Sequence, residues 1–243
     1  MPGWEARSYG EAFADVYDEW YGGVSDVDTT VQRVAALAPA GGRVLELGVG
    51  TGRLAVPLAE AGLEVWGVDA SNAMLDRLRA NDPSGRVHAV LGDMAGPLPT
   101  GPFDVVLVAY NTLFNLVTER AQRDCLRAVA GVLSGRGSLL IEAFVPDLAG
   151  EVVRHVEPRL VGDGLVLDVS VRDPVAQTVR GQQVHLTSDA VRLRPWRIRY
   201  VSPAQCDAIA EEAGLALLDR WADWDGSRFG DDAVRHLSRY GRA

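Results

Sequence analysis

Short apolar runs alternate with longer amphipathic stretches between residues 41 and 144, and this alternation constrains the fold more than any other feature of the chain. The apolar runs predict strands over 44–47, 63–68, 87–91, 103–109 and 137–144. Helical spacing of apolar residues predicts helices over 53–61, 71–80 and 119–133. Such alternation is typical of a parallel sheet covered on both faces. We therefore predict an α/β fold with a doubly wound, mostly parallel sheet.

The first forty residues predict a helical cover for this core. Phe13, Val16, Tyr17 and Trp20 recur at the three- and four-residue spacing of one helix face, and a Gly-Gly pair then interrupts the pattern. The helical spacing resumes after the glycines and continues to a proline near the end of the segment. We therefore assign residues 1–40 to an N-terminal helical cover.

The pattern changes again after the last predicted core strand. The stretches LVLDVSVRD and TVRGQQVHLTSDAVRLRPWRIRYV alternate apolar and polar side chains with turn signals between them, which is typical of antiparallel β-hairpins. We assign residues 148–200 to this hairpin insertion. A helix capped by Ser202 and two strands, ALLDRWAD and AVRHLSRY, then complete a sheet of seven strands. The predicted core is thus residues 41–147 and 201–243, with the hairpins inserted as a lid.

Composition and charge disfavour several classes of function. A net charge of −9 disfavours nucleic acid and anionic membranes as partners, because phosphate groups attract clusters of cationic side chains. All 24 basic residues are arginine, so no lysine of this chain can form a Schiff base. Neither the two cysteines nor the four histidines show metal-ligand spacing, so we expect no metal. With no evident signal leader and no apolar run of roughly 18 residues, we expect a cytoplasmic protein.

The stretch VLELGVGTGR, residues 44–53, places a glycine-rich loop between a predicted strand and a predicted helix. Gly48, Gly50 and Gly52 allow a sharp turn and a close approach of the backbone to a ligand. The spacing G-x-G-x-G followed by Arg53 differs from the G-x-G-x-x-G of dinucleotide sites and from the lysine-containing phosphate loop. The free amides at the start of the helix suit a carboxylate or a phosphate equally well.

Polar residues end the next strands, at the sheet edge where such folds bind ligands. Asp69 ends the second strand about 20 residues after Gly48, where an acid accepts hydrogen bonds from ribose hydroxyls. Asp93 and Met94 end the third strand, where a carboxylate suits an exocyclic amine and a thioether suits a ring face. The fourth strand, FDVVLVAYN, ends in aromatic and polar residues.

The ordered motifs ELGVGTG, GVDAS, GDM and FDVVLVAYN resemble those of class I S-adenosylmethionine-dependent methyltransferases across residues 44–144. The resemblance implies that S-adenosylmethionine is the cofactor. It implies a cofactor site made of Tyr17, Tyr21, Glu46, Gly48, Gly50, Gly52, Arg53, Asp69, Ala70, Asp93, Met94, Ala109 and Tyr110. A dehydrogenase is disfavoured because Arg53 stands where a dinucleotide site needs glycine, and a cofactor-binding protein without catalysis is the alternative from another class.

The resemblance also implies individual roles. The glycines would pass under the methionyl group, with Glu46 beneath the loop to order it. Asp69 would hold the ribose hydroxyls, with Ala70 beside the adenine. Asp93 would accept from the adenine amine and Met94 would pack on the ring, although a plain core methionine is the alternative. A carbonyl near Ala109 or Tyr110 would meet the amino group of the cofactor.

Tyr17 and Tyr21 lie four residues apart and share one helix face in the stretch YDEWY. The stretch is similar to the N-terminal helix of small-molecule N-methyltransferases that act on amino sugars or lincosamide antibiotics. The similarity implies that a tyrosine reaches the carboxylate of the cofactor and closes the site, with Tyr9 as a third hydroxyl. The alternative is that these aromatic side chains only pack in the core.

The methyl acceptor is expected to lie beyond the fourth and fifth strands, under the hairpin lid. The candidate catalytic residues are Tyr17, Asn111, Phe114 and Asn115, and the candidate substrate-binding residues are Tyr9, Glu142, Phe144, His185 and Trp196. A neutral amine needs positioning more than a base. The expected activity is therefore N-methylation of a small-molecule amine in natural-product tailoring, and the sequence leaves a homo-oligomer open.

The alternative activity is O- or C-methylation of a sugar, phenol or polyketide with a general base. Such a base would come from His155, His185 or Glu142. The other two histidines, His88 and His236, lie in predicted strands and are expected to be structural.

Overall fold

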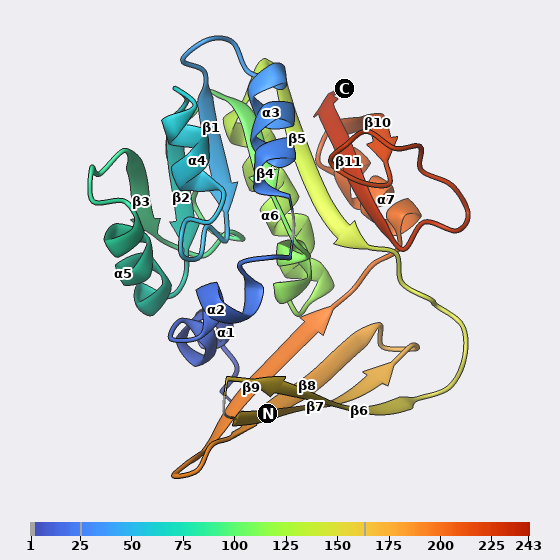
Figure 1. Ribbon diagram of the computed structural model, residues 1–243. Helices are drawn as coiled ribbons and strands as arrows, with labels where there is room; N and C mark the ends of the chain where they lie inside the picture. Colours follow the sequence, from blue (N-terminus) through green and yellow to red (C-terminus); the bar gives the residue numbers. More distant parts are fainter. Residues whose placement is uncertain (1–2, 25, 163) are drawn as a thin grey trace.

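A computed structural model describes residues 3–24, 26–162 and 164–243, and its centre is a seven-stranded sheet (Figure 1). The strand order is β10-β11-β5-β4-β1-β2-β3; β1 to β5 run parallel, and β11 pairs antiparallel with β5 and β10. The strands are β1 Arg43–Leu47, β2 Glu64–Asp69, β3 Val87–Leu91, β4 Phe103–Val108, β5 Leu133–Phe144, β10 Leu215–Trp221 and β11 Arg235–Arg242. The predicted doubly wound α/β fold is confirmed.

Helices cover both faces of this sheet (Figure 1). They are α3 Val27–Leu37, α4 Ala55–Glu60 and α5 Asn72–Asn81 on one face, and α6 Glu119–Val132 and α7 Pro203–Glu212 on the other. Successive strand residues serve opposite faces. Leu107 packs with α3, α4 and α5, whereas its neighbours Val106 and Val108 pack with α6 and α7.

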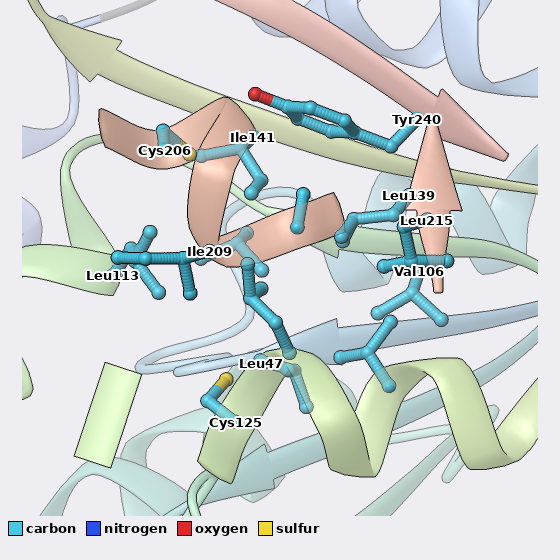
Figure 2. Close-up of a cluster of buried hydrophobic side chains, with 14 of the residues drawn as sticks. Leu47, Val106, Leu113, Cys125, Leu139, Ile141, Cys206, Ile209, Leu215 and Tyr240 are labelled. Atoms are coloured by element: carbon cyan, nitrogen blue, oxygen red, sulfur yellow. The ribbon is translucent and has the colours of Figure 1, made fainter. Parts of the chain in front are cut away.

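Both cysteines belong to the core on the α6 and α7 side. Figure 2 shows Cys125 on α6 and Cys206 on α7 among the leucine and isoleucine side chains that pack on the sheet. Burial raises the pKa of the Cys125 thiol to about 12 and that of the Cys206 thiol to about 11. Both residues therefore act as small apolar groups.

The N-terminal cover begins with two short helices, α1 (Ser8–Phe13) and α2 (Tyr17–Tyr21), so the expectation of one continuous helix is wrong. The chain leaves helical geometry at Val16, whose φ is −120°. This break lets Phe13 and Val16 both pack around Met74 of α5. The helix α3 follows and packs beside α4 in the central core.

The insertion forms a separate antiparallel sheet in the order β6-β7-β8-β9, and it lies beneath α1 and α2 in Figure 1. Its strands are β6 Val153–Val161, β7 Gly164–Asp173, β8 Thr178–Leu186 and β9 Val191–Arg199. The predicted hairpins are confirmed, but the sequence pattern missed β6. Pro158 lies in the middle of β6, where it lacks the amide of an ordinary strand residue, and only an edge strand tolerates this.

One ion pair ties the lid sheet to the cover. The guanidinium of Arg194 on β9 donates to both carboxylate oxygens of Asp15, at 2.5 and 2.8 Å. Its nitrogens hold the pKa of the Asp15 carboxyl below its usual range. The predicted three-part division of the chain stays a prediction. The helix α3, which falls within the predicted cover, packs in the core.

Candidate active site

A cavity of about 330 Å³ lies between the carboxyl ends of the parallel strands and a roof made of α1, α2 and the lid sheet. Its floor includes the glycine loop after β1 and the residues that follow β2, β3 and β4. Ligands of doubly wound folds bind outside these strand ends. The lid side is formed by residues of β7, β8 and β9.

The glycine loop takes left-handed backbone conformations that favour glycine. Gly48 and Gly50 have φ values of +68° and +57°. A Cβ on Gly48 would come within 2.4 Å of the Thr112 side chain, so the residue also permits close packing with the turn after β4. The loop is held from the side by Asp69, whose Oδ2 accepts from the Gly50 amide at 2.9 Å.

Asp69 supports the cavity wall at the end of β2. Its Oδ1 accepts from the Ser71 amide at 2.9 Å, and each carboxylate oxygen keeps a second lone pair for a further donor. Burial raises the pKa of Asp69, and the amides of Ser71 and Gly50 oppose this shift. At the end of β3, Asp93 is exposed and accepts from the Ala95 amide at 2.9 Å.

Glu46 lies beneath the glycine loop and is 5% exposed. Its carboxylate accepts from the amide of Ala55. Ala55 is the first residue of α4, which begins two residues later than predicted. Burial raises the pKa of Glu46 to about 8, the charge of Arg53 opposes the shift, and Asp69 adds to it. The Oε2 atom of Glu46 has no hydrogen-bond partner among the described residues.

Four tyrosine rings gather over the loop. The ring centroids of Tyr17 and Tyr21 lie 5.1 Å apart, and those of Tyr21 and Tyr110 lie 6.4 Å apart. Tyr9 stacks on Phe13 at 4.6 Å beside them. Burial raises the pKa of Tyr9, Tyr17 and Tyr110, so these phenols are hydrogen-bond donors at neutral pH.

Asp18 anchors α2 to the glycine loop, a contact that the sequence analysis missed. Its Oδ1 accepts from the Thr51 hydroxyl at 2.5 Å, and its Oδ2 accepts from the Asn81 amide at 3.2 Å. Asn81 also donates to the Thr51 carbonyl at 3.0 Å. The signal was present in the sequence, because Asp18 stands beside Tyr17 in the YDEWY stretch.

The turn after β4 adopts a strained conformation at two residues. Tyr110 and Asn111 have φ values of +44° and +63°, which non-glycine residues rarely adopt. Glu142 supports both, since its Oε2 accepts from the Tyr110 amide at 2.9 Å and its carbonyl accepts from the Asn111 amide at 3.0 Å. The Asn111 side chain accepts from the Phe144 amide at 2.7 Å, which fixes this end of the cavity.

Known proteins share this arrangement. Residues 44–137 match the family model described as a methyltransferase domain. The chain is 30% identical over 215 residues to the cypemycin N-terminal methyltransferase of a Streptomyces species, and the match covers 86% of this chain and 87% of that protein. The chain belongs to the S-adenosylmethionine-dependent methyltransferases.

Solved structures of other methyltransferases share the whole fold. The CcbJ methyltransferase of Streptomyces caelestis is 38% identical with a TM-score of 0.90, and the superposition covers 99% of this chain and 100% of that one. The amino pentose methyltransferase CalS10 of Micromonospora echinaspora, solved with bound S-adenosylmethionine, has a TM-score of 0.72 at 20% identity, with 94% and 97% covered. At that identity the second likeness shows the fold alone.

Most of the residues predicted for the methyltransferase site line this one cavity. They are Tyr9, Tyr17, Tyr21, Gly48, Gly50, Asp69, Ala70, Asp93, Met94, Tyr110, Asn111, Asn115, Phe144 and Trp196. The structure therefore brings together the glycine loop, the acids at the strand ends and the tyrosines of the cover. Their roles toward cofactor and acceptor stay predictions.

The other predicted residues are not among those that line the cavity: Glu46, Gly52, Arg53, Ala109, Phe114, Glu142 and His185. Phe114 is fully buried and packs edge-on against Phe144 at 5.0 Å, so the expectation that it faces the acceptor is wrong. Glu142 instead holds the turn after β4, and His185 packs edge-on against Trp20 at 5.2 Å. The Ala109 carbonyl accepts from the Thr112 amide at 3.0 Å.

The remaining histidines of the methyltransferase lie away from the cavity. His236 is buried in β11, where burial lowers its pKa to about 4, and His88 stacks with Trp66. His155 lies on β6, within 3.2 Å of Glu157. Over the part of the chain that the structure describes, no three metal-binding side chains gather, and no helix is long and apolar enough to cross a membrane.

Proposed function

We propose that this methyltransferase transfers a methyl group to the nitrogen of a small-molecule amine in natural-product biosynthesis. The observation that carries the proposal is one wall of the cavity beside the tyrosines of the roof. This wall is formed by Asn115, Phe144, Trp196 and Ile198. Such a wall positions an acceptor, and positioning is the main requirement of a neutral amine nucleophile. The cypemycin N-terminal methyltransferase, by its name, also methylates an amine.

The cavity fits S-adenosylmethionine by several of its own features. The backbone of Gly48 and Gly50 leaves room that side chains would fill, and the unpartnered Oε2 of Glu46 lies beneath them. Asp69 would hold the ribose hydroxyls with its remaining lone pairs, and Asp93 would hold the adenine amine. S-adenosylmethionine supplies a methyl group that its sulfonium already activates for transfer.

The chain itself orients the acceptor and excludes water. Tyr17 and Tyr21 would close the cavity from α2, and burial keeps the Tyr17 hydroxyl protonated by raising its pKa, so it is available to a carboxylate. The lid sheet contributes Trp196 to the same roof, where it packs in one cluster with Tyr17 and Tyr21. With S-adenosylmethionine bound, these groups would orient the amine toward the methyl group and would keep competing water out.

The test is methyl transfer to matched acceptors. We would incubate the protein with labelled S-adenosylmethionine and pairs of small molecules that carry an amine or a hydroxyl at the same position, and detect the gain of one methyl by mass spectrometry. Transfer only to amines, with a pH profile set by the acceptor's own deprotonation, is the expected result. Transfer to hydroxyls with a profile set by a group of the enzyme would replace N-methylation by O-methylation.

A further inference from the structure

The lid sheet contributes a carboxyl–amide pair to the cavity that the sequence analysis did not predict. Asp168 on β7 and Gln183 on β8 lie directly opposite each other in the antiparallel register, and both line the cavity. The Gln183 amide nitrogen donates to Asp168 Oδ2 at 2.9 Å and to the Tyr21 hydroxyl at 3.3 Å. The pair therefore joins the lid to the tyrosine roof.

The orientation of the Gln183 amide is fixed by its neighbours. Arg159 donates to Gln183 Oε1 at 3.4 Å, and a guanidinium can only donate hydrogen bonds. The amide nitrogen must then face Asp168 and Tyr21. Gln183 is 6% exposed, so this is a built and largely dry arrangement.

Asp168 retains unused hydrogen-bonding capacity. Its Oδ1 atom is buried and finds no partner within residues 3–24, 26–162 and 164–243. A buried carboxyl oxygen without a donor is unfavourable, and a ligand that brings an N–H or O–H group removes the deficit. The pair thus has the chemistry of a receptor for a hydrogen-bond donor.

The charged residues of the cavity wall all have the same sign. Within the described chain they are Asp69, Asp93 and Asp168, with no arginine or histidine among the lining residues. Asp69 and Asp93 lie at the strand ends, whereas Asp168 lies on the lid. A nucleoside diphosphate in this cavity would meet three carboxylates in the wall, because Arg159 lies behind Gln183 and donates to its Oε1 atom. An amine would form charge-assisted hydrogen bonds with the same carboxylates.

We propose that Asp168, oriented by Gln183, recognises a hydrogen-bond donor of the methyl acceptor, and that the acceptor is an amine-bearing molecule without phosphate. The inference rests on the proposed function, because it names the substrate class of the same cavity. Asp168 would determine the specificity for the acceptor, whereas the residues at the strand ends would bind the cofactor.

The test uses the protein saturated with S-adenosylhomocysteine and isothermal titration with three probes. The probes are prolinamide, the methyl glycoside of a deoxyamino sugar, and the thymidine diphosphate ester of the same sugar. We expect the first or second to bind and the diphosphate ester not to bind. Asp168→Asn keeps the size of the side chain and its contact with Gln183, and it should weaken amine binding at least tenfold with S-adenosylhomocysteine affinity unchanged.

Two further variants separate recognition from structural support. Gln183→Met removes the amide at similar length and should weaken amine binding in the same direction. Glu151→Gln changes an exposed carboxyl just before β6 of the same sheet that does not line the cavity, and it should have no effect. Binding of the diphosphate ester, no binding of either amine, or unchanged amine affinity in Asp168→Asn would overturn the inference. Asp168-dependent amine binding without methyl transfer to any amine would overturn the proposed function alone.

Discussion

Glu46 shows how a single residue can make the stability of this protein depend on pH. It is a buried acid whose pKa of about 8 lies well above the usual value of 4.5. The native state therefore binds more protons than the unfolded state between about pH 4.5 and pH 8, and stability falls as the pH rises through this window. The acid is tolerated because its other oxygen accepts from the Ala55 amide and Arg53 lies near.

We predict that Glu46→Gln flattens this dependence. The comparison is the free energy of unfolding of the ligand-free variant minus that of the wild type. This difference should be roughly 2–4 kcal/mol larger at pH 8 than at pH 5. Urea unfolding at several pH values measures the difference. His236, whose pKa is lowered to about 4, titrates in both proteins and cancels from the comparison. Parallel pH profiles for the two proteins would contradict the prediction.

The residues that sequence could predict are those tied to strand ends by motif spacing. Gly48, Asp69 and Asp93 follow apolar strands directly, and parallel strands bring their carboxyl ends to one edge. Phe114 and Glu142 also lie near strand ends but are buried, since a shift of one position in a turn or strand moves a side chain to the other side. Spacing along the chain does not reveal which side of the strand or turn a side chain faces.

At the scale of elements, α2 depends on an anchor outside its own five residues. A helix this short is not stable alone, so the Asp18 contacts with Thr51 and Asn81 position its tyrosines over the glycine loop. We predict that Asp18→Ala raises the KM for S-adenosylmethionine about tenfold, equivalent to about 1.4 kcal/mol, with a smaller change in kcat. Steady-state kinetics with an amine that accepts the methyl group measures both parameters.

Glu19→Ala is the matched control, because Glu19 is an exposed acid of the same helix. It should leave the KM unchanged. Equal effects of the two substitutions would show that the charge of α2 matters and that the anchor does not.

Elements with strong periodicity were predicted from sequence, and those shaped by distant contacts were not. The helices α5 and α6 and the strands of the core follow from local pattern. The position of α1 depends on another segment, since a Cβ on Gly10 would come within 2.4 Å of that of Ser71, and Phe13 and Val16 on either side of the break both pack in one cluster with Met74. The strand β6 depends on its place at the sheet edge, which Pro158 conceals in the sequence.

At the scale of the whole molecule, the lid sheet has two unlike faces. The face with Asp168 and Gln183 closes the cavity. The opposite face, which we call the outer lid face, exposes Val156, Leu160 and Leu193 to 61%, 83% and 61%. These side chains alternate with the cavity-facing ones along each strand, so they share one surface.

An apolar surface of this extent is unusual on a monomer and is typical of an interface. Two neighbouring rows of the outer lid face are apolar from β6 to β9, for example the row of Pro158, Leu167, Val184 and Leu193. Three arginines, Arg154, Arg180 and Arg197, line one end of it, and the opposite end carries the exposed Asp189 at the β8–β9 turn. A second copy could pack the same face against this one with the ends reversed, as in a two-fold symmetric dimer. The arginines of each copy would then meet the aspartate of the other, and the apolar centre would be covered.

We therefore predict that the protein forms a homo-oligomer through the outer lid face. Sedimentation velocity at micromolar concentration should show a dimer or larger species, and Leu193→Glu should shift it to monomer with cofactor binding retained, because Leu193 does not line the cavity. Val175→Glu places the same charge on a residue 93% exposed in the β7–β8 turn and should leave the oligomer intact. A wild-type monomer would contradict the prediction.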